Sequence, residues 1–204
     1  RGIFSGGYSP SPVSGNVNVM EYITFASAGN ALDFGDQSDG SSFLVRYTSS
    51  GISNGTRGII AGGYTGGGYV DTIVYVPNIA SLSDTSDFGN LSGQRAQMCG
   101  CSDTTRGVFM GGYLNPTSLN TIEYITIAST GNAQDFGDLT NSGSSGSALS
   151  NSIRGVTQIG NGNIINYVNI QTTGNATHFG DLNTVGGSLG ANASYSDSHG
   201  GLAE

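Results

Sequence analysis

The string Asp-Phe-Gly occurs three times in this chain, beginning at Asp33, Asp87 and Asp135. In protein kinases the same string holds a magnesium ion, but it occurs there once, together with a Lys and a catalytic Asp. This chain contains no Lys, because all six of its positively charged side chains are Arg. We therefore interpret each copy as the end of a β-strand followed by a turn, with its Phe packed between neighbouring units, and not as a nucleotide site.

His and Cys are too scattered to form a catalytic or metal centre. His178 and His199 stand where other copies of the motifs have an Asp and an Arg, and decay of a repeat explains both. Cys99 and Cys101 would share one face of a strand, which is a poor geometry for a disulfide, so we expect two buried thiols. Since no unique group of acid, base and nucleophile interrupts the repeat, we predict that the protein is not an enzyme and has no cofactor.

Turns rich in oxygen ligands are the remaining place for a metal ion. Calcium is bound by carboxylate and amide oxygens, and Asp36, Asp39, Asp138 and Asp181 follow the Phe-Gly strings. Asp, Asn and Gly are also the residues of ordinary turns. We favour turns without metal, and the sequence leaves calcium binding open.

Arg and Asp recur in equivalent columns of the sequence. The arginines are Arg1, Arg57, Arg106 and Arg154, and the aspartates are Asp33, Asp87 and Asp135. A ring of such charges would suit a ligand, but a guanidinium also bridges carboxylates and backbone carbonyls within a fold. We favour the structural role and predict repeated ion pairs between the two columns.

These columns belong to four copies of one unit, approximately residues 1–52, 53–102, 103–152 and 153–204. The first three copies have Arg-Gly, a short apolar run and a glycine pair, then a Tyr-containing run, then Phe-Gly, and the fourth is a worn copy with Gly160-Asn161 in place of the glycine pair. In the third copy we predict strands at 106–110, 121–128, 133–139 and 148–152, and we expect equivalents of the last, small-residue strand at 43–47, 97–101 and 189–195. No helical periodicity persists anywhere in the chain.

Four short strands in each unit of about 50 residues are typical of a β-propeller blade. We predict an all-β fold in one domain over residues 1–204: a four-bladed propeller with four antiparallel strands per blade and the small-residue strand innermost. The glycine pair and the following Tyr resemble kelch repeats, with the Phe of Phe-Gly in place of the usual Trp. Because the chain begins at a second strand, we expect residues 189–195 to close the ring; a segment of a longer array is the alternative.

Loops after the glycine pair carry the candidate binding residues. They differ most between copies, they would leave the ring on one face, and they contribute Tyr8, Tyr64, Tyr69 and Tyr113. Loops of Tyr, Ser, Gly and Asn on a rigid β-scaffold have the composition of adaptable binding surfaces. Unconstrained drift of loop sequence is the alternative explanation.

The ordered strings Arg-Gly-Val-Phe-Met-Gly-Gly-Tyr, Thr-Ile-Glu-Tyr-Ile-Thr-Ile-Ala-Ser-Thr-Gly-Asn-Ala and Asp-Phe-Gly-Asp-Leu, within residues 106–139, resemble repeats of kelch-like virion proteins of marine bacteriophages, including phages of cyanobacteria. This resemblance implies a structural or attachment protein of the virion, in a tail, a fibre or a capsid decoration. It also implies other virion proteins as partners, and a glycan or protein receptor on the host surface.

Net charge gives independent limits on the partners. The formal net charge is −8, and a Lys-free acidic chain is poorly suited to bind the phosphates of nucleic acid or an anionic membrane. No apolar run approaches the roughly 20 residues of a membrane span, so we expect no membrane insertion. Two alternatives to a virion protein remain open, a carbohydrate-binding lectin-type propeller and an intracellular protein-interaction kelch module.

Overall fold

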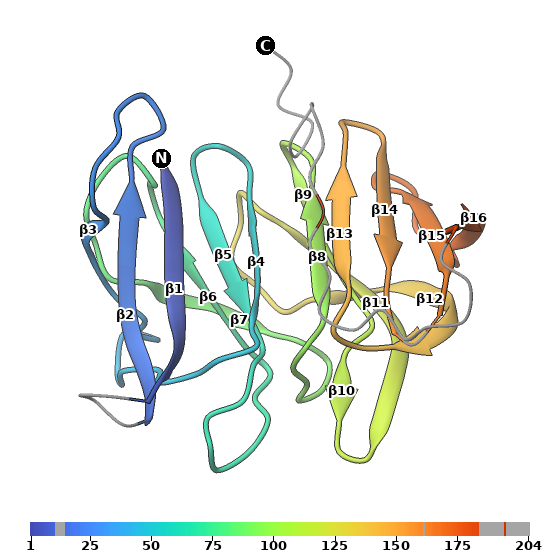
Figure 1. Ribbon diagram of the computed structural model, residues 1–204, viewed down its shortest axis with the longest axis horizontal. Helices are drawn as coiled ribbons and strands as arrows, with labels where there is room; N and C mark the ends of the chain where they lie inside the picture. The colour runs from blue at the N-terminus through green and yellow to red at the C-terminus, as the bar shows by residue number, and fades with distance from the viewer. Residues whose placement is uncertain (11–14, 161, 184–193, 195–204) are drawn as a thin grey trace.

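The computed structural model describes residues 1–10, 15–160, 162–183 and 194, and all regular elements in these residues are β-strands. The strands form four antiparallel sheets that follow one another in chain order, from β1 to β16 (Figure 1). No helix in the described part of the chain is long and apolar enough to cross a membrane. The all-β prediction is therefore confirmed.

The sheets are offset from the predicted units, because in sheets 2, 3 and 4 the first strand comes from the end of the preceding unit. Sheet 1 contains β1 (Gly2–Ser9), β2 (Gly15–Ile23) and β3 (Leu32–Asp36). Sheet 2 contains β4 (Ser50–Ser53), β5 (Gly58–Ala61), β6 (Thr72–Val76) and β7 (Ser86–Asn90). Sheet 3 contains β8 (Cys99–Ser102), β9 (Arg106–Met110), β10 (Tyr113–Leu114), β11 (Thr117–Thr126) and β12 (Gln134–Gly143). Sheet 4 contains β13 (Ser147–Ser150), β14 (Arg154–Gln158), β15 (Ile164–Asn169) and β16 (Thr177–Asp181).

The glycine pair bends the chain sharply at the end of the second strand in sheets 2 and 3. After β9, Gly111 and Gly112 have φ angles of 62° and 120°, a region that side chains rarely adopt. A Cβ atom on Gly111 would also lie 2.8 Å from the carbonyl oxygen of Gly143. Both the backbone conformation and the close approach of the neighbouring segment therefore require glycine.

Small residues let the innermost strands of neighbouring sheets approach closely, as predicted. A Cβ atom on Gly100 in β8 would lie 2.7 Å from Cγ2 of Ile52 in β4. The hydroxyl of Ser102 donates to the Ser53 carbonyl at 2.8 Å, and the hydroxyl of Ser150 in β13 donates to the Ser102 carbonyl at the same distance. These contacts hold sheets 2, 3 and 4 together along their inner edges.

One inner strand was predicted in the wrong place. Residues 43–47 alternate like a strand, but the inner strand of that unit is β4, at Ser50–Ser53. Thr48 has a φ of 57°, which ends any extended run, and the side chain of Arg46 is buried instead of alternating out to solvent. The small residues of β4 fit the crowded inner position better than Phe43, which is exposed.

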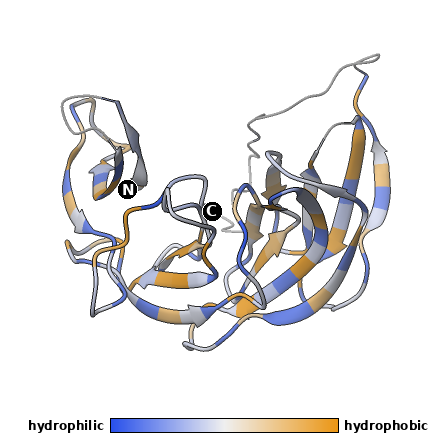
Figure 2. Ribbon diagram, turned by 90° about the horizontal axis from the view of Figure 1, so that it is seen from below, coloured by the Kyte–Doolittle hydropathy of each residue, from blue (hydrophilic) through white to orange (hydrophobic). Residues whose placement is uncertain are grey.

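The described sheets lie along an arc and no closed ring is shown (Figure 2). Sheet 1 has three strands in the described residues and lacks the inner strand that the other sheets have, as the phase of the repeat predicts. The strand expected to close the ring, at residues 189–195, falls outside the described residues. Closure therefore stays a prediction.

A row of tyrosines on the loop face

Five tyrosine side chains form an uninterrupted row, each ring in edge or tilted contact with the next. Ring centroids are 6.3 Å apart for Tyr8 and Tyr47, 5.7 Å for Tyr47 and Tyr64, 5.0 Å for Tyr64 and Tyr69, and 6.1 Å for Tyr69 and Tyr113. Such geometry is the favourable arrangement of aromatic rings. The structure thus brings together all four predicted binding residues and adds Tyr47; we call the five residues the tyrosine row.

The topology explains why residues so far apart in sequence meet. The loops that follow β1, β5 and β9 all leave the sheets at the lower end in Figure 1. Tyr8 lies at the end of β1, Tyr64 follows the glycine pair after β5, and Tyr113 opens the β10–β11 hairpin. Tyr69 comes from the loop of sheet 2, and Tyr47 from the segment that joins sheets 1 and 2.

Backbone hydrogen bonds hold the centre of the row. Tyr47 and Tyr64 exchange two of them, with N···O distances of 3.1 Å and 2.9 Å. Tyr64 is bridged in turn to Tyr69, and the hydroxyl of Tyr64 donates to the Gly66 carbonyl at 3.3 Å. The central rings are therefore positioned before any partner arrives, which lowers the entropy that binding has to overcome.

A buried arginine anchors the segment that carries Tyr47. The Arg46 side chain is 1% exposed, and its Nε donates to Oε1 of Gln37 at 2.8 Å. Its two terminal nitrogens donate to the carbonyls of Gly62, Thr72 and Ile60 in sheet 2, at 3.0, 2.8 and 3.3 Å. Burial lowers the pKa of Arg46 to about 10, which still leaves it charged at neutral pH. Arg95 occupies the equivalent position between sheets 2 and 3, where Ala96 pairs with Tyr113.

The Tyr69 hydroxyl favours its protonated form. Loss of hydration raises the pKa of the Tyr69 hydroxyl above its ordinary value, and the neighbouring hydroxyl of Tyr113 acts in the same direction. Tyr8 at one end of the row is 61% exposed, whereas the other four rings are half-buried. The row therefore presents apolar ring edges together with hydroxyl groups, a combination suited to a partner with both apolar and hydrogen-bonding groups.

The repeated arginines have aromatic partners. Each guanidinium lies over the ring of the Tyr on the neighbouring strand of its own sheet, 4.3 to 5.0 Å from the ring centroid. The pairs are Arg1 with Tyr22, Arg57 with Tyr75, Arg106 with Tyr124, and Arg154 with Tyr167.

Two of these arginines also bridge to the next sheet. Nη1 of Arg57 donates to the carbonyls of Ile127 and Ala128, both at 2.9 Å, and Nη1 of Arg106 donates to the Ile170 carbonyl at 3.2 Å. In the described residues the ion pairs join other side chains, and the aspartates expected as partners, Asp33, Asp87 and Asp135, lie exposed on the outer strands. The predicted Arg–Asp pairs are therefore replaced by cation–π contacts and backbone bridges, which leave the aspartates in water.

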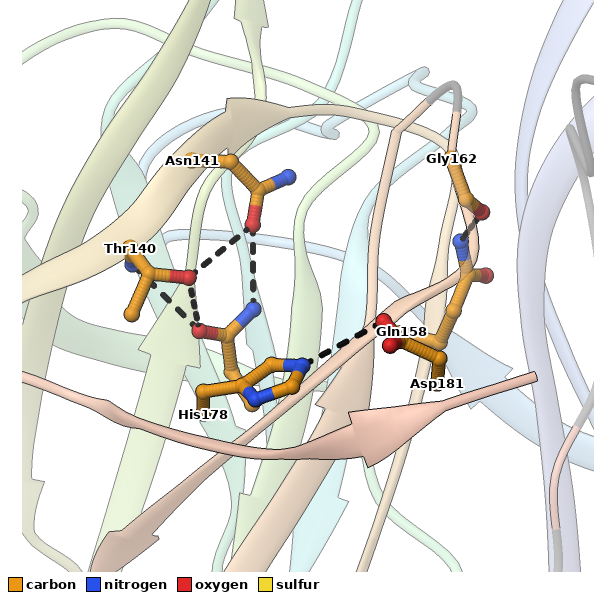
Figure 3. A network of polar contacts seen from close by, with 7 residues as sticks. Thr140, Asn141, Gln158, Gly162, His178 and Asp181 are labelled. Atoms are coloured by element: carbon orange, nitrogen blue, oxygen red, sulfur yellow. Dashed lines mark hydrogen bonds and ion pairs between the residues drawn. The ribbon is translucent and has the colours of Figure 1, made fainter.

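The fourth unit carries a different polar network at its junction with sheet 3 (Figure 3). The buried Asn166 accepts from the backbone N–H of Thr140 at 3.3 Å and donates to Oδ1 of Asn141 at 3.1 Å. His178 lies 3.2 Å from Asp181, and both side chains are about half exposed. This exposed pair belongs to the outer strand β16 and makes no contact with the tyrosine row, which suits the interpretation of His178 as a decayed repeat position.

No group of three or more His, Cys, Asp or Glu that would hold a metal ion occurs in the described part of the chain. The carboxylate of Asp39 accepts from the N–H groups of Ser41 and Ser42, each at 2.8 Å, and these hydrogen bonds lower its pKa. Asp39 thus closes a tight turn of its own. His199 lies outside the described residues.

Sequence reasoning missed Tyr47, Arg46 and Arg95. Tyr47 has no Tyr in the equivalent columns, which hold Ala96 and Ser144, so no repeat marks it. The two arginines are 49 residues apart, the same step as between Arg57 and Arg106, and this spacing was the available signal. Comparisons of this chain with models of protein families and with curated proteins find no match.

Proposed function

We propose that this protein is a non-enzymatic component of a bacteriophage particle, in a tail, a fibre or a capsid decoration, and that it contacts its partner through the tyrosine row. The observation that carries the proposal is the row itself: five tyrosines from three sheets converge on one face. Aromatic anchors of this kind contribute large contact area at small cost in side-chain entropy. The virion location rests on the resemblance of the repeats to those of marine phage proteins.

The partner is another virion protein or a glycan or protein receptor on the host surface. The four sheets would act as kelch-type propeller blades, a rigid support on which loops vary without disturbing the core. A lectin that binds carbohydrate with the same face is the second candidate function, because aromatic rings with hydroxyl groups at their edges also suit a sugar.

Substitution of the row tests the proposal. Tyr8→Ala, Tyr64→Ala, Tyr69→Ala and Tyr113→Ala are each scored for particle assembly and for adsorption of particles to cells. We expect losses of about tenfold or more for the central Tyr64 and Tyr69, since truncating a central anchor typically costs about 2 kcal/mol or more. Asp36→Ala and Asp138→Ala, on outer strands away from the row, are the controls.

The outcomes separate the candidate functions. Loss of assembly with intact adsorption of assembled particles identifies a virion protein as the partner. Binding of the isolated chain to a glycan array, abolished by the same substitutions while particles lack the chain, identifies a lectin. If all Tyr variants assemble and adsorb normally while the Asp variants do not, the tyrosine row is the wrong face.

A further inference from the structure

Neighbouring sheets are joined by a repeated junction at their outer strands. Where sheet 3 meets sheet 2, the N–H groups of Gly131 and Ala133 donate to the carbonyls of Phe88 and Asn90, at 2.7 and 2.8 Å. The backbone N–H of Asn90 donates to Oδ1 of Asn132 at 3.0 Å. A Gly-Asn-Ala turn of one sheet thus continues the hydrogen bonding of the preceding sheet's outer strand.

The junction of sheets 3 and 4 repeats this geometry almost atom for atom. The backbone N–H groups of Gly174 and Ala176 donate to the carbonyls of Phe136 and Asp138, at 2.7 and 2.8 Å. The backbone N–H of Asp138 donates to Oδ1 of Asn175 at 3.0 Å. The junction of sheets 1 and 2 follows the same scheme with a Ser-Asp-Thr turn at residues 83–85. The contact is therefore a property of the repeat.

Within the described residues, the outer strand β16 of sheet 4 repeats the Phe-Gly string without a turn against it. Phe179 is 55% exposed, whereas its equivalents Phe34, Phe88 and Phe136 are at most 2% exposed. A Cβ atom on Gly137 would lie 2.5 Å from the Gly174 carbonyl oxygen, but a Cβ on Gly180 would have no heavy atom within 4 Å. In the described residues, the outer strand of sheet 4 thus has the strand half of the junction and no turn packed against it.

Sheet 1, at the opposite end of the arc, carries an exposed turn of the kind that forms the other half of the junction. Residues 29–31 are Gly-Asn-Ala, the same turn that sheets 3 and 4 use, and Asn30 is exposed. Phe25 is 77% exposed, whereas its equivalents Ile127 and Ile170 are fully buried by the preceding sheet. Those two residues also receive the bridging hydrogen bonds of Arg57 and Arg106.

We propose that the two ends bind each other between two copies of this chain. The turn at 29–31 of one copy docks on the Phe179–Gly180–Asp181 edge of the other, and Arg154 reaches the backbone carbonyl of Phe25 as Arg57 and Arg106 reach Ile127 and Ile170. The two surfaces lie at opposite ends of the row of sheets, which favours a second copy over the same chain (Figure 1). This proposal does not depend on the function of the tyrosine row.

The kind of contact and the number of sheets per copy together indicate how many copies would form a closed ring. Contacts between two different surfaces are head-to-tail and give a ring when the rotation closes. Two copies contribute eight sheets, which lies within the range of about four to eight blades found in closed propellers. We therefore expect a two-chain ring, which is the alternative to closure of a ring within one chain by residues 189–195.

Directed disulfide formation tests the contact. Asn30→Cys and Asp181→Cys replace exposed residues whose equivalents, Asn132 with Asn90 and Asn175 with Asp138, are hydrogen-bonded neighbours. The two single variants, carrying tags of different mass, are mixed and oxidised. We expect a mixed dimer that dissociates on reduction, in excess over the dimers that either variant forms alone.

A double variant provides the matched control and the opposing outcome. Asp138→Cys with Asn175→Cys must form a disulfide within one chain, which establishes that this geometry permits the bond. If Asn30→Cys with Asp181→Cys gives only an internal disulfide at monomer mass, the ring closes within one chain and the second copy is wrong. If neither mixed dimer nor internal disulfide forms while the control pair does, the two ends do not bind each other.

Sedimentation of a glycine variant tests the same contact without cross-linking. Gly180→Val adds a side chain into open space in the single chain, so at concentrations where both proteins are monomeric its melting temperature stays that of the wild type. At the junction it would collide with the docked turn, as Gly137→Val would collide with Gly174. We expect the association constant of the Gly180→Val dimer to be about tenfold or more below that of the wild type. Equal dimer fractions in both proteins would overturn the proposal.

Discussion

Arg95 and Glu123 form a buried ion pair where sheet 2 meets sheet 3. Nη2 of Arg95 donates to Oε2 of Glu123, and the two side chains are 3% and 1% exposed. The other carboxylate oxygen accepts from the backbone N–H of Ser92 at 2.8 Å. Burial lowers the pKa of Arg95, and Glu123 opposes this effect by stabilising the charged form.

Removing the carboxylate should destabilise the protein strongly. Glu123→Ala leaves a guanidinium buried without its counter-charge, and breaking such pairs typically costs about 3–5 kcal/mol. Urea unfolding followed by circular dichroism measures the change.

Replacing both Arg95 and Glu123 by apolar residues distinguishes two effects: the loss of their mutual attraction, and the cost of a buried charge without a partner. Val74 stands in the Glu123 column of sheet 2, so Val fits this position. We expect Arg95→Met with Glu123→Val to recover much of the stability lost in Glu123→Ala. A double variant as unstable as the single one would show that the pair holds the junction by attraction.

The features that could be predicted from the sequence are those that recur in the repeat. The glycine pair, the Phe-Gly string and the small inner strand recur in phase, so their positions and the all-β sheets followed from alignment of the chain with itself. Tyr8, Tyr64, Tyr69 and Tyr113 were found because they follow the repeated turn. The inner strand of the first unit was misplaced, because alternation of side chains at 43–47 says nothing of the φ angle of Thr48.

The contact partners of the arginines were not predicted from the sequence. Arg46 reaches carbonyls 14 to 26 residues away, and no pattern of residue types marks a backbone carbonyl as an acceptor. The cation–π contacts of the arginines were likewise missed, since a Tyr and an Asp in the adjacent columns are both plausible partners of a guanidinium.

The two cysteines should resist modification while the protein is folded. Both thiols are buried, and burial raises the pKa of Cys99 to about 11 and raises that of Cys101 still further. Because the thiolate is the reactive form, we expect no labelling by iodoacetamide at pH 8 and full labelling of both residues in urea. Mass spectrometry counts the labels, and modification of the native protein at either site would contradict the buried placement.

Arg106 should contribute measurably to stability through its two contacts. Its guanidinium lies 4.3 Å from the centroid of Tyr124 and donates to the Ile170 carbonyl of the next sheet. We expect Arg106→Ala to lower the free energy of unfolding by about 1–2 kcal/mol, from the lost cation–π contact and hydrogen bond. Arg106→Lys, which keeps the charge but not the planar donor set, should recover only part of it.

A matched control for this variant is Arg154→Ala, tested on the protein at concentrations where it is monomeric. Arg154 keeps the contact with its own ring, Tyr167, but it is exposed. Its loss should therefore cost less than the loss of Arg106. Equal effects of the two substitutions would mean that the bridge to Ile170 adds nothing.

Ionisation of Tyr69 should occur above the ordinary value for tyrosine of about 10. Its folded-state pKa is raised, chiefly by loss of hydration and then by the neighbouring hydroxyl of Tyr113. A raised pKa means that the neutral hydroxyl stabilises the fold at pH values below the unfolded pKa, and that this contribution is lost as the pH rises through the folded pKa. The contribution of Tyr69 is therefore expected to be fully present at pH values below the ordinary pKa of tyrosine. Absorbance at 295 nm measures the titration: the difference between the wild type and Tyr69→Phe should be a single step with a midpoint above that of free tyrosine. A midpoint at or below the ordinary value would show that Tyr69 is hydrated and does not lie in the closely packed centre of the row.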